Sequence, residues 1–184
     1  MSRIRNQSHG VIHDIHSRTV GLATRMYKKK YRDLFFDVVA MAQDKYHFEL
    51  LSLIVMPNHF HIMIKTNGDD VTISRIMQFI KSVFARKLNK MTGGFGAVWS
   101  ERFRNTVITD QVVFLQKLMK QAHDPVRSGF VTDPRFYEYG TINAYLDVNY
   151  KSMLRVTLHE FYLELGNTPE ERIEAFLVYE KAYF

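Results

Sequence analysis

The sequence predicts an α+β fold in which one antiparallel sheet packs against amphipathic helices. Apolar residues recur every three or four positions in residues 28–45 and 72–91, which is the spacing of a buried helix face. Residues 59–65 instead place apolar side chains at positions 60, 62 and 64 and polar ones at 59, 61 and 65, which is the two-residue period of a strand. The apolar run 47–56 precedes this strand across a proline–asparagine turn, which favours an antiparallel hairpin.

The other elements complete the fold in chain order. Residues 9–20 mix β-branched and polar side chains and suit a first strand, and residues 99–109 suit a fourth. Asp110 is a favoured N-cap for a third helix. That helix is expected to end at Asp124–Pro125, because the residue before proline disfavours the helical conformation. This order of elements is that of the split βαβ, ferredoxin-like arrangement, with helices packed on one face of the sheet.

The C-terminal part is expected to be helical. Residues 150–165 and 168–183 read as two helices, and Thr168-Pro-Glu-Glu has the pattern of a capping box with proline at the first helical position. We therefore expect a main domain over residues 1–149 and a helical extension over residues 150–184 that packs on it.

Composition and charge favour a folded, nucleic-acid-binding protein. Of the 184 residues, 46% are hydrophobic, which is enough for a substantial core. The net charge is +6, but residues 150–184 carry −2, so residues 1–149 carry +8. Such a basic body suggests a polyanionic partner, with an ordinary basic protein as the alternative. The absence of cysteine excludes disulfides and thiol catalysis, and no apolar run predicts a membrane span or signal peptide, so we expect a cytoplasmic protein.

The second helix carries an unusual set of charges. Between Thr72 and Met91 there are five cations and no acid, whereas a merely solvated face normally mixes both signs. We therefore predict nucleic-acid contacts from this helix and from two arginines of the strand that follows. The predicted contact residues are Arg75, Lys81, Arg86, Lys87, Lys90, Arg102 and Arg104.

Two histidines separated by one residue form a candidate metal site. In a strand, His59 and His61 share one face while Phe60, Ile62 and Ile64 can anchor the other face on the core. The pair could hold a divalent ion if oxygen ligands arrive from elsewhere, and the alternative is two half-buried structural histidines. His13 and His16 fall on opposite faces of the first strand, so each is expected to be a surface or capping histidine.

Three segments together resemble the single-tyrosine HUH transposases of insertion-sequence type, and are most similar to the REP-associated tyrosine transposases. The first is VMPNHFHIMIK, whose His59-Phe60-His61 matches the His-hydrophobic-His motif. The second is Trp99-Ser-Glu-Arg-Phe, which is similar to W-x-x-R-F. The third is Asp124-Pro-Val-Arg-Ser-Gly-Phe-Val, which is similar to N-P-V-x-x-G-x-V. The resemblance extends over roughly residues 9–184.

The resemblance implies binding of single-stranded or hairpin DNA, with Mg²⁺ or Mn²⁺ held by His59, His61 and Asp124 beside the scissile phosphate. It also implies a tyrosine on the third helix that attacks this phosphate and forms a covalent link. Lys120 occupies the position of that tyrosine, one helical turn before Asp124. Relatives act as monomers or homodimers, and both states remain open for this chain.

Two functional hypotheses follow from the presence of lysine, rather than tyrosine, at position 120. The chain is either a transposase-type enzyme that cleaves and rejoins DNA, or a non-catalytic descendant that binds DNA or RNA hairpins. Lysine cannot simply replace tyrosine, because its ammonium is protonated unless its pKa is strongly lowered. Tyr137 or Tyr139 could approach from the following loop, but both are expected to pack against the sheet. Hydrolysis by a metal-activated water is a third reading.

Overall fold

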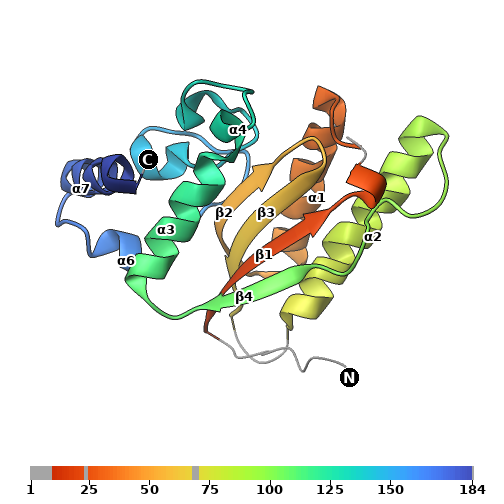
Figure 1. Cartoon of the computed structure of the whole chain (residues 1–184). Coiled ribbons are helices and arrows are strands. Elements are labelled where there is room, and N and C mark those ends of the chain that lie inside the picture. The colour runs from red at the N-terminus through yellow and green to blue at the C-terminus, as the bar shows by residue number, and fades with distance from the viewer. Residues whose placement is uncertain (1–9, 23–24, 68–70, 184) are drawn as a thin grey trace.

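The computed structural model describes residues 10–22, 25–67 and 71–183, and these form a four-stranded antiparallel sheet with helices on both sides (Figure 1). The strand order is β2-β3-β1-β4. The elements of this part are β1 (Ile12–Arg18), α1 (Lys29–Tyr46), β2 (Glu49–Val55), β3 (His59–Lys65), α2 (Ile73–Thr92), β4 (Arg104–Ile108) and α3 (Gln111–Ala122). The predicted order of strands and helices is therefore confirmed, and so is the β2–β3 hairpin.

Local sequence signals explain where these elements begin and end. Thr72 accepts a hydrogen bond from the backbone NH of Arg75 and so caps α2, and Gly93 ends that helix in the left-handed conformation. Asp110 caps α3 as predicted, by accepting from the backbone NH of Val113. The fourth strand is shorter than expected: Trp99 makes only an isolated bridge to Thr19 before β4 begins at Arg104.

The two faces of the sheet pack against different helices. On one face, Phe60, Ile62 and Ile64 of β3 join the buried side chains of α1 and α2, as the strand pattern predicted. On the other face, Met63 and Ile108 contribute to a second core under α3, which lies in front of the sheet in Figure 1. The expectation of helices on one face thus holds for α1 and α2, whereas α3 packs on the opposite face. The apolar residues under α3 occupy only one end of that face. The other end, which carries His16, His59 and Arg104, has polar side chains and is not part of this core.

The C-terminal segment differs from the sequence expectation. Residues 150–165 are not one helix, since only α6 (Glu160–Leu163) forms there. Val156 instead bridges Leu50 of β2, and the backbone NH of Thr157 donates to the Leu50 carbonyl at 2.8 Å. Tertiary pairing with a strand edge thus overrides the local helical pattern. Three further α-helices lie in the described C-terminal part, namely α4 (Asp124–Arg127), α5 (Asn143–Leu146) and α7 (Pro169–Tyr183).

The predicted capping box of the last helix is confirmed. The backbone NH of Glu171 donates to the Thr168 hydroxyl, and the Glu171 carboxylate accepts from the Thr168 backbone NH, both at 3.2 Å. Phe176 of α7 is buried with Tyr145 and Tyr162 in the core beneath α3. The C-terminal helices therefore brace α3.

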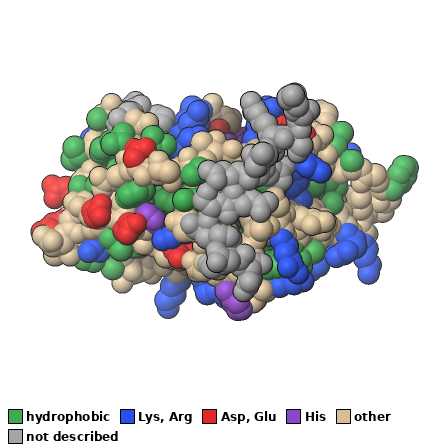
Figure 2. All heavy atoms as spheres, turned by 90° about the horizontal axis from the view of Figure 1, so that it is seen from below, with side chains coloured by type: hydrophobic (Ala, Val, Ile, Leu, Met, Phe, Trp, Pro, Cys, Tyr) green, Lys and Arg blue, Asp and Glu red, His purple; other side chains and the backbone are tan. Residues whose placement is uncertain are grey.

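The predicted charge asymmetry is visible on the surface. Figure 2 shows acidic side chains gathered at the end that carries α6 and α7, and lysine and arginine side chains gathered toward the end that carries α2. Among the described residues, no helix is long and apolar enough to cross a membrane.

Candidate metal and nucleic-acid site

The uncovered polar end of the sheet face forms a basin of about 400 Å³ between the strands and the α3–α4 corner. The histidines His59 and His61 of β3 lie in its wall, on the face opposite to Phe60 and Ile62. Lys120 and Asp124 reach the same basin from the α3–α4 corner. The structure thus brings together the predicted metal ligands and Lys120, the residue at the position where the resemblance implies a tyrosine.

A third histidine, His16, belongs to this cluster, so the expectation of a surface or capping residue was wrong. His16 of β1 lies directly opposite His61 in the antiparallel register, and their ring centroids are 4.4 Å apart. The ring of His59 is 5.4 Å from that of His16. One ring nitrogen from each of the three histidines lies within 4.8 Å of the corresponding nitrogen of the other two. Single-strand periodicity could not reveal this contact, although the polar series Asp14, His16 and Arg18 marks the shared face.

Asp124 is held against this cluster by the turn that follows α3. Its carboxylate oxygen Oδ2 lies 2.7 Å from Nε2 of His59, and Nδ1 of His59 lies 2.7 Å from the side-chain oxygen of Asn58. The Asn58 contact fixes the orientation of the ring so that Nε2 faces the carboxylate. The ring of the neighbouring His123 points elsewhere, and its Nε2 lies 2.6 Å from a carboxylate oxygen of Glu180 in α7.

Burial sets the protonation of the cluster. Burial, reinforced by the neighbouring imidazoles, lowers the pKa of His61 to about 3. Burial and the nearby His59 lower the pKa of His16 to about 4. Burial alone would raise the pKa of Asp124, but the hydrogen bond and charge of His59 lower it. At neutral pH the site therefore presents two neutral imidazoles and a carboxylate, which are the forms that bind metal ions.

Cations surround the cluster. Those that line the basin are Arg18, Arg104, Lys117, Lys120 and Arg127. Lys117 pairs with the carboxylate of Asp14 at 2.8 Å, whereas Lys120 is exposed at the rim. Because these cations outnumber the two carboxylates of the basin, Asp14 and Asp124, the site suits a phosphate group.

The two candidate tyrosines lie away from the basin. The hydroxyl of Tyr137 donates to the Val55 carbonyl at 2.8 Å, and burial raises the pKa of Tyr137 to about 12. The hydroxyl of Tyr139 donates to the Asp33 carboxylate at 2.8 Å. Both rings belong to the core under α1 and α2, as expected of packing aromatics. Among the residues that the structure describes, no tyrosine lines the basin.

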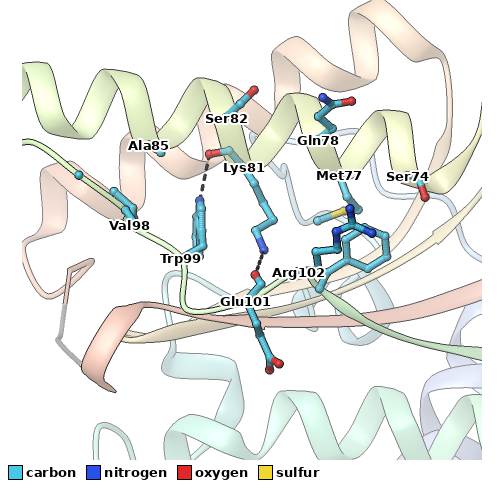
Figure 3. A pocket seen from close by; sticks show the side chains of 13 residues that line it. Ser74, Met77, Gln78, Lys81, Ser82, Ala85, Val98, Trp99, Glu101 and Arg102 are labelled. Carbon is cyan, nitrogen blue, oxygen red and sulfur yellow. Dashed lines mark hydrogen bonds between the residues drawn. The ribbon is translucent and has the colours of Figure 1, made fainter. Parts of the chain in front are cut away.

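The predicted cations of α2 lie on the other side of the sheet from the histidines. Four of them are exposed, namely Arg75, Arg86, Lys87 and Lys90. Lys81 is buried instead: its ammonium donates to the Glu101 carbonyl at 2.7 Å, and its own carbonyl accepts from the indole NH of Trp99 at 2.9 Å (Figure 3). Arg102 is exposed beside this contact, where it lines a groove of about 700 Å³ between α2 and residues 96–103. Of the predicted DNA contacts, only Arg104 lies in the basin.

Comparison with known proteins identifies the family of this chain. Residues 22–120 match the model of a family described as transposase IS200-like. A REP-associated tyrosine transposase of Haemophilus influenzae is 22% identical over 129 residues, which are 65% of this chain and 73% of that protein.

Two solved structures have a similar fold. One is a REP-associated tyrosine transposase bound to a REP hairpin, with a TM-score of 0.69, 17% identity, and coverage of 87% of this chain and 96% of that chain. The other is a bacterial tRNA(His) guanylyltransferase-like protein in complex with GTP, with a TM-score of 0.52, 10% identity, and coverage of 73% and 72%. Because the family model spans more than half of the sequence, the chain belongs to the IS200-like transposase family.

Proposed function

We propose that this protein binds hairpin or single-stranded DNA at the histidine basin without the tyrosine chemistry of its family. The observation that carries the proposal is the composition of the basin wall. The wall holds His59, His61, Asp124 and several cations. Lys120 is one of these cations, and the resemblance implies a tyrosine at its position. A protonated lysine at that position would contact a phosphate as a charge rather than attack it.

The two cationic regions would have separate roles. Arg104, Lys120 and Arg127 would contact the phosphates of the strand in the basin. The exposed cations of α2, such as Arg86 and Lys87, lie on the opposite face and would contact a different part of the DNA. The relative with the similar structure was solved with a REP hairpin, which supports a hairpin as the first DNA to test.

A divalent ion fits the donor set of the basin. Two imidazoles of β3 and the carboxylate of Asp124 converge there, and the resemblance implies Mg²⁺ or Mn²⁺. When bound, such an ion would polarise an oxygen of the phosphate. His59 and Asp124 would orient it, and the surrounding lysines and arginines would hold the DNA strand against it.

Fluorescence anisotropy with a labelled DNA hairpin in EDTA tests the binding. We expect affinity to fall with salt at a logarithmic slope of roughly −4. The three basin cations would each contribute about −0.7 on a single strand, and Arg86 and Lys87 about −0.9 each on the duplex stem. Lys120→Ala and Arg104→Ala should each weaken binding and reduce the slope, whereas Lys151→Ala, an exposed lysine in the acidic C-terminal segment, should change neither. Salt-independent binding, or equal effects of all three variants, would contradict the proposal.

A denaturing gel tests the loss of covalent chemistry. After incubation of the hairpin with the protein and Mn²⁺, no DNA should migrate as a protein adduct. A covalent adduct mapped to any tyrosine would show that the enzyme reading is correct instead. Cleavage without an adduct would favour the third reading, hydrolysis by a metal-activated water, because three imidazoles at the site could hold the metal ion.

A further inference from the structure

The His16 side chain changes the chemistry of the candidate metal site. A pair of histidines with one carboxylate leaves a divalent ion with mostly oxygen and water ligands. In this chain, the register of β1 against β3 places His16 beside His61, so that a third imidazole faces the same point. The donor set is then three nitrogens within 4.8 Å of one another, with the Asp124 oxygen 2.7 Å from the His59 nitrogen.

Nitrogen-rich donor sets discriminate between metal ions. Mg²⁺ demands oxygen ligands in a nearly octahedral arrangement and retains several waters. Zn²⁺ and its neighbours Co²⁺ and Ni²⁺ bind imidazole strongly, and three histidines with one further ligand form a familiar four-coordinate zinc site. We propose that His16 is a third imidazole ligand and that the basin takes Zn²⁺ or a similar late first-row ion in preference to Mg²⁺.

The required movement is small. Zn–N bonds of about 2.0 Å place the ligands of a tetrahedral ion roughly 3.3 Å apart. The imidazole nitrogens, now up to 4.8 Å apart, would move inward, and the 2.7 Å contact between His59 and Asp124 would open around the ion. The guanidinium of Arg18, whose Nε donates to Nε2 of His16 at 3.4 Å, would release that nitrogen; its side chain is exposed and free to turn outward.

The inference deepens the proposed function, since it assigns the ion of the same basin, but its test does not require DNA. Isothermal titration of the full chain with Zn²⁺ and with Mg²⁺ measures the preference directly. We expect one Zn²⁺ per chain, bound roughly 100-fold more tightly than Mg²⁺. Titration with Co²⁺ should give the visible absorption of a four-coordinate ion.

Variants assign the third ligand. His16→Asn should weaken Zn²⁺ binding roughly 10- to 100-fold and remove the four-coordinate Co²⁺ absorption. The matched control is His47→Asn, at an exposed histidine with left-handed backbone (φ 50°) that asparagine adopts readily; it should bind both ions as the wild type does. Wild-type Zn²⁺ affinity in His16→Asn, or equal affinity of the wild type for Mg²⁺ and Zn²⁺, would overturn the proposal.

A measurement on the unmodified protein guards against a variant that fails to fold. Ring-nitrogen NMR of the wild type should show Zn²⁺-dependent shifts for His16, His59 and His61 together. Shifts confined to His59 and His61 would overturn the role of His16. Hairpin binding in EDTA is measured separately, so a failure of DNA binding remains distinguishable from a failure of metal selection.

Discussion

Gln121 joins α3 to the floor of the basin, and its removal should destabilise the protein strongly. Its side-chain NH₂ donates to the Asp14 carboxylate at 2.9 Å, and its side-chain oxygen accepts from the Ser52 hydroxyl at 2.7 Å. All three residues are buried. Gln121→Ala deletes both hydrogen bonds and leaves two buried polar groups with fewer partners.

The magnitude follows from the number of groups affected. A buried group that loses its partner costs about 1–3 kcal/mol, and the Asp14 carboxylate keeps its 2.8 Å contact with Lys117. Two such groups therefore give a loss of about 3 kcal/mol in the free energy of unfolding. For a protein of this length, a loss of that size lowers the Tm by roughly 6–12 °C.

Urea denaturation followed by circular dichroism measures the loss. The matched control is Gln78→Ala, which removes an exposed glutamine from α2 and should change the stability by no more than about 0.5 kcal/mol. If Gln121→Ala costs less than about 1 kcal/mol, the network does not hold α3 on the sheet and our assignment of its role is wrong.

Three further predictions address the basin and the cations of α2. Lys120→Tyr restores the expected nucleophile, so with Mn²⁺ and a DNA hairpin it should give a covalent adduct on a denaturing gel; no adduct would mean that more than the nucleophile is missing. Because burial lowers the pKa of His61 from 6.5 to about 3, and each pKa unit corresponds to about 1.4 kcal/mol, the metal-free protein should be most stable above pH 6.5 and lose roughly 4 kcal/mol as pH falls to 3. His61→Asn should flatten the urea-measured stability over that range. Lys87→Ala should reduce the salt slope of hairpin binding by about 1 without changing the Tm, whereas Lys81→Ala should lower the Tm and leave the slope unchanged. Identical effects of the two lysine variants would contradict the separate roles of the exposed and buried side chains.

Local patterns predicted most of the sheet and part of the site. The alternation in β3 sufficed to place His59 and His61 on one face, because strand periodicity is a property of a single segment. His16 was missed because its contact depends on the register between two strands that are far apart in sequence. Lys81 was predicted to contact nucleic acid, but it lies four residues after Met77 and three before Phe84, on the buried stripe of α2. Its aliphatic stem is covered while its ammonium reaches a carbonyl oxygen.

The C-terminal misprediction has the same physical origin. Residues 150–158 contain no strong helix breaker, so their local sequence permits a helix. The unpaired edge of β2 offers backbone partners that this local sequence does not encode, and Val156 takes one of them. Backbone pairing between residues that are far apart in sequence is difficult to predict from the local pattern of one segment.

The isolated backbone bridges on β2 also cover the edge of the sheet. Gly140 and Val156 occupy backbone groups along the outer side of β2, which protects that edge from pairing with another chain. At the opposite end of the sheet, β4 has only five residues and begins with an exposed arginine, Arg104. Short, charged edge strands are poor templates for the growth of intermolecular sheets. The same arginine that lines the basin therefore also helps this basic, aromatic-rich chain to resist aggregation.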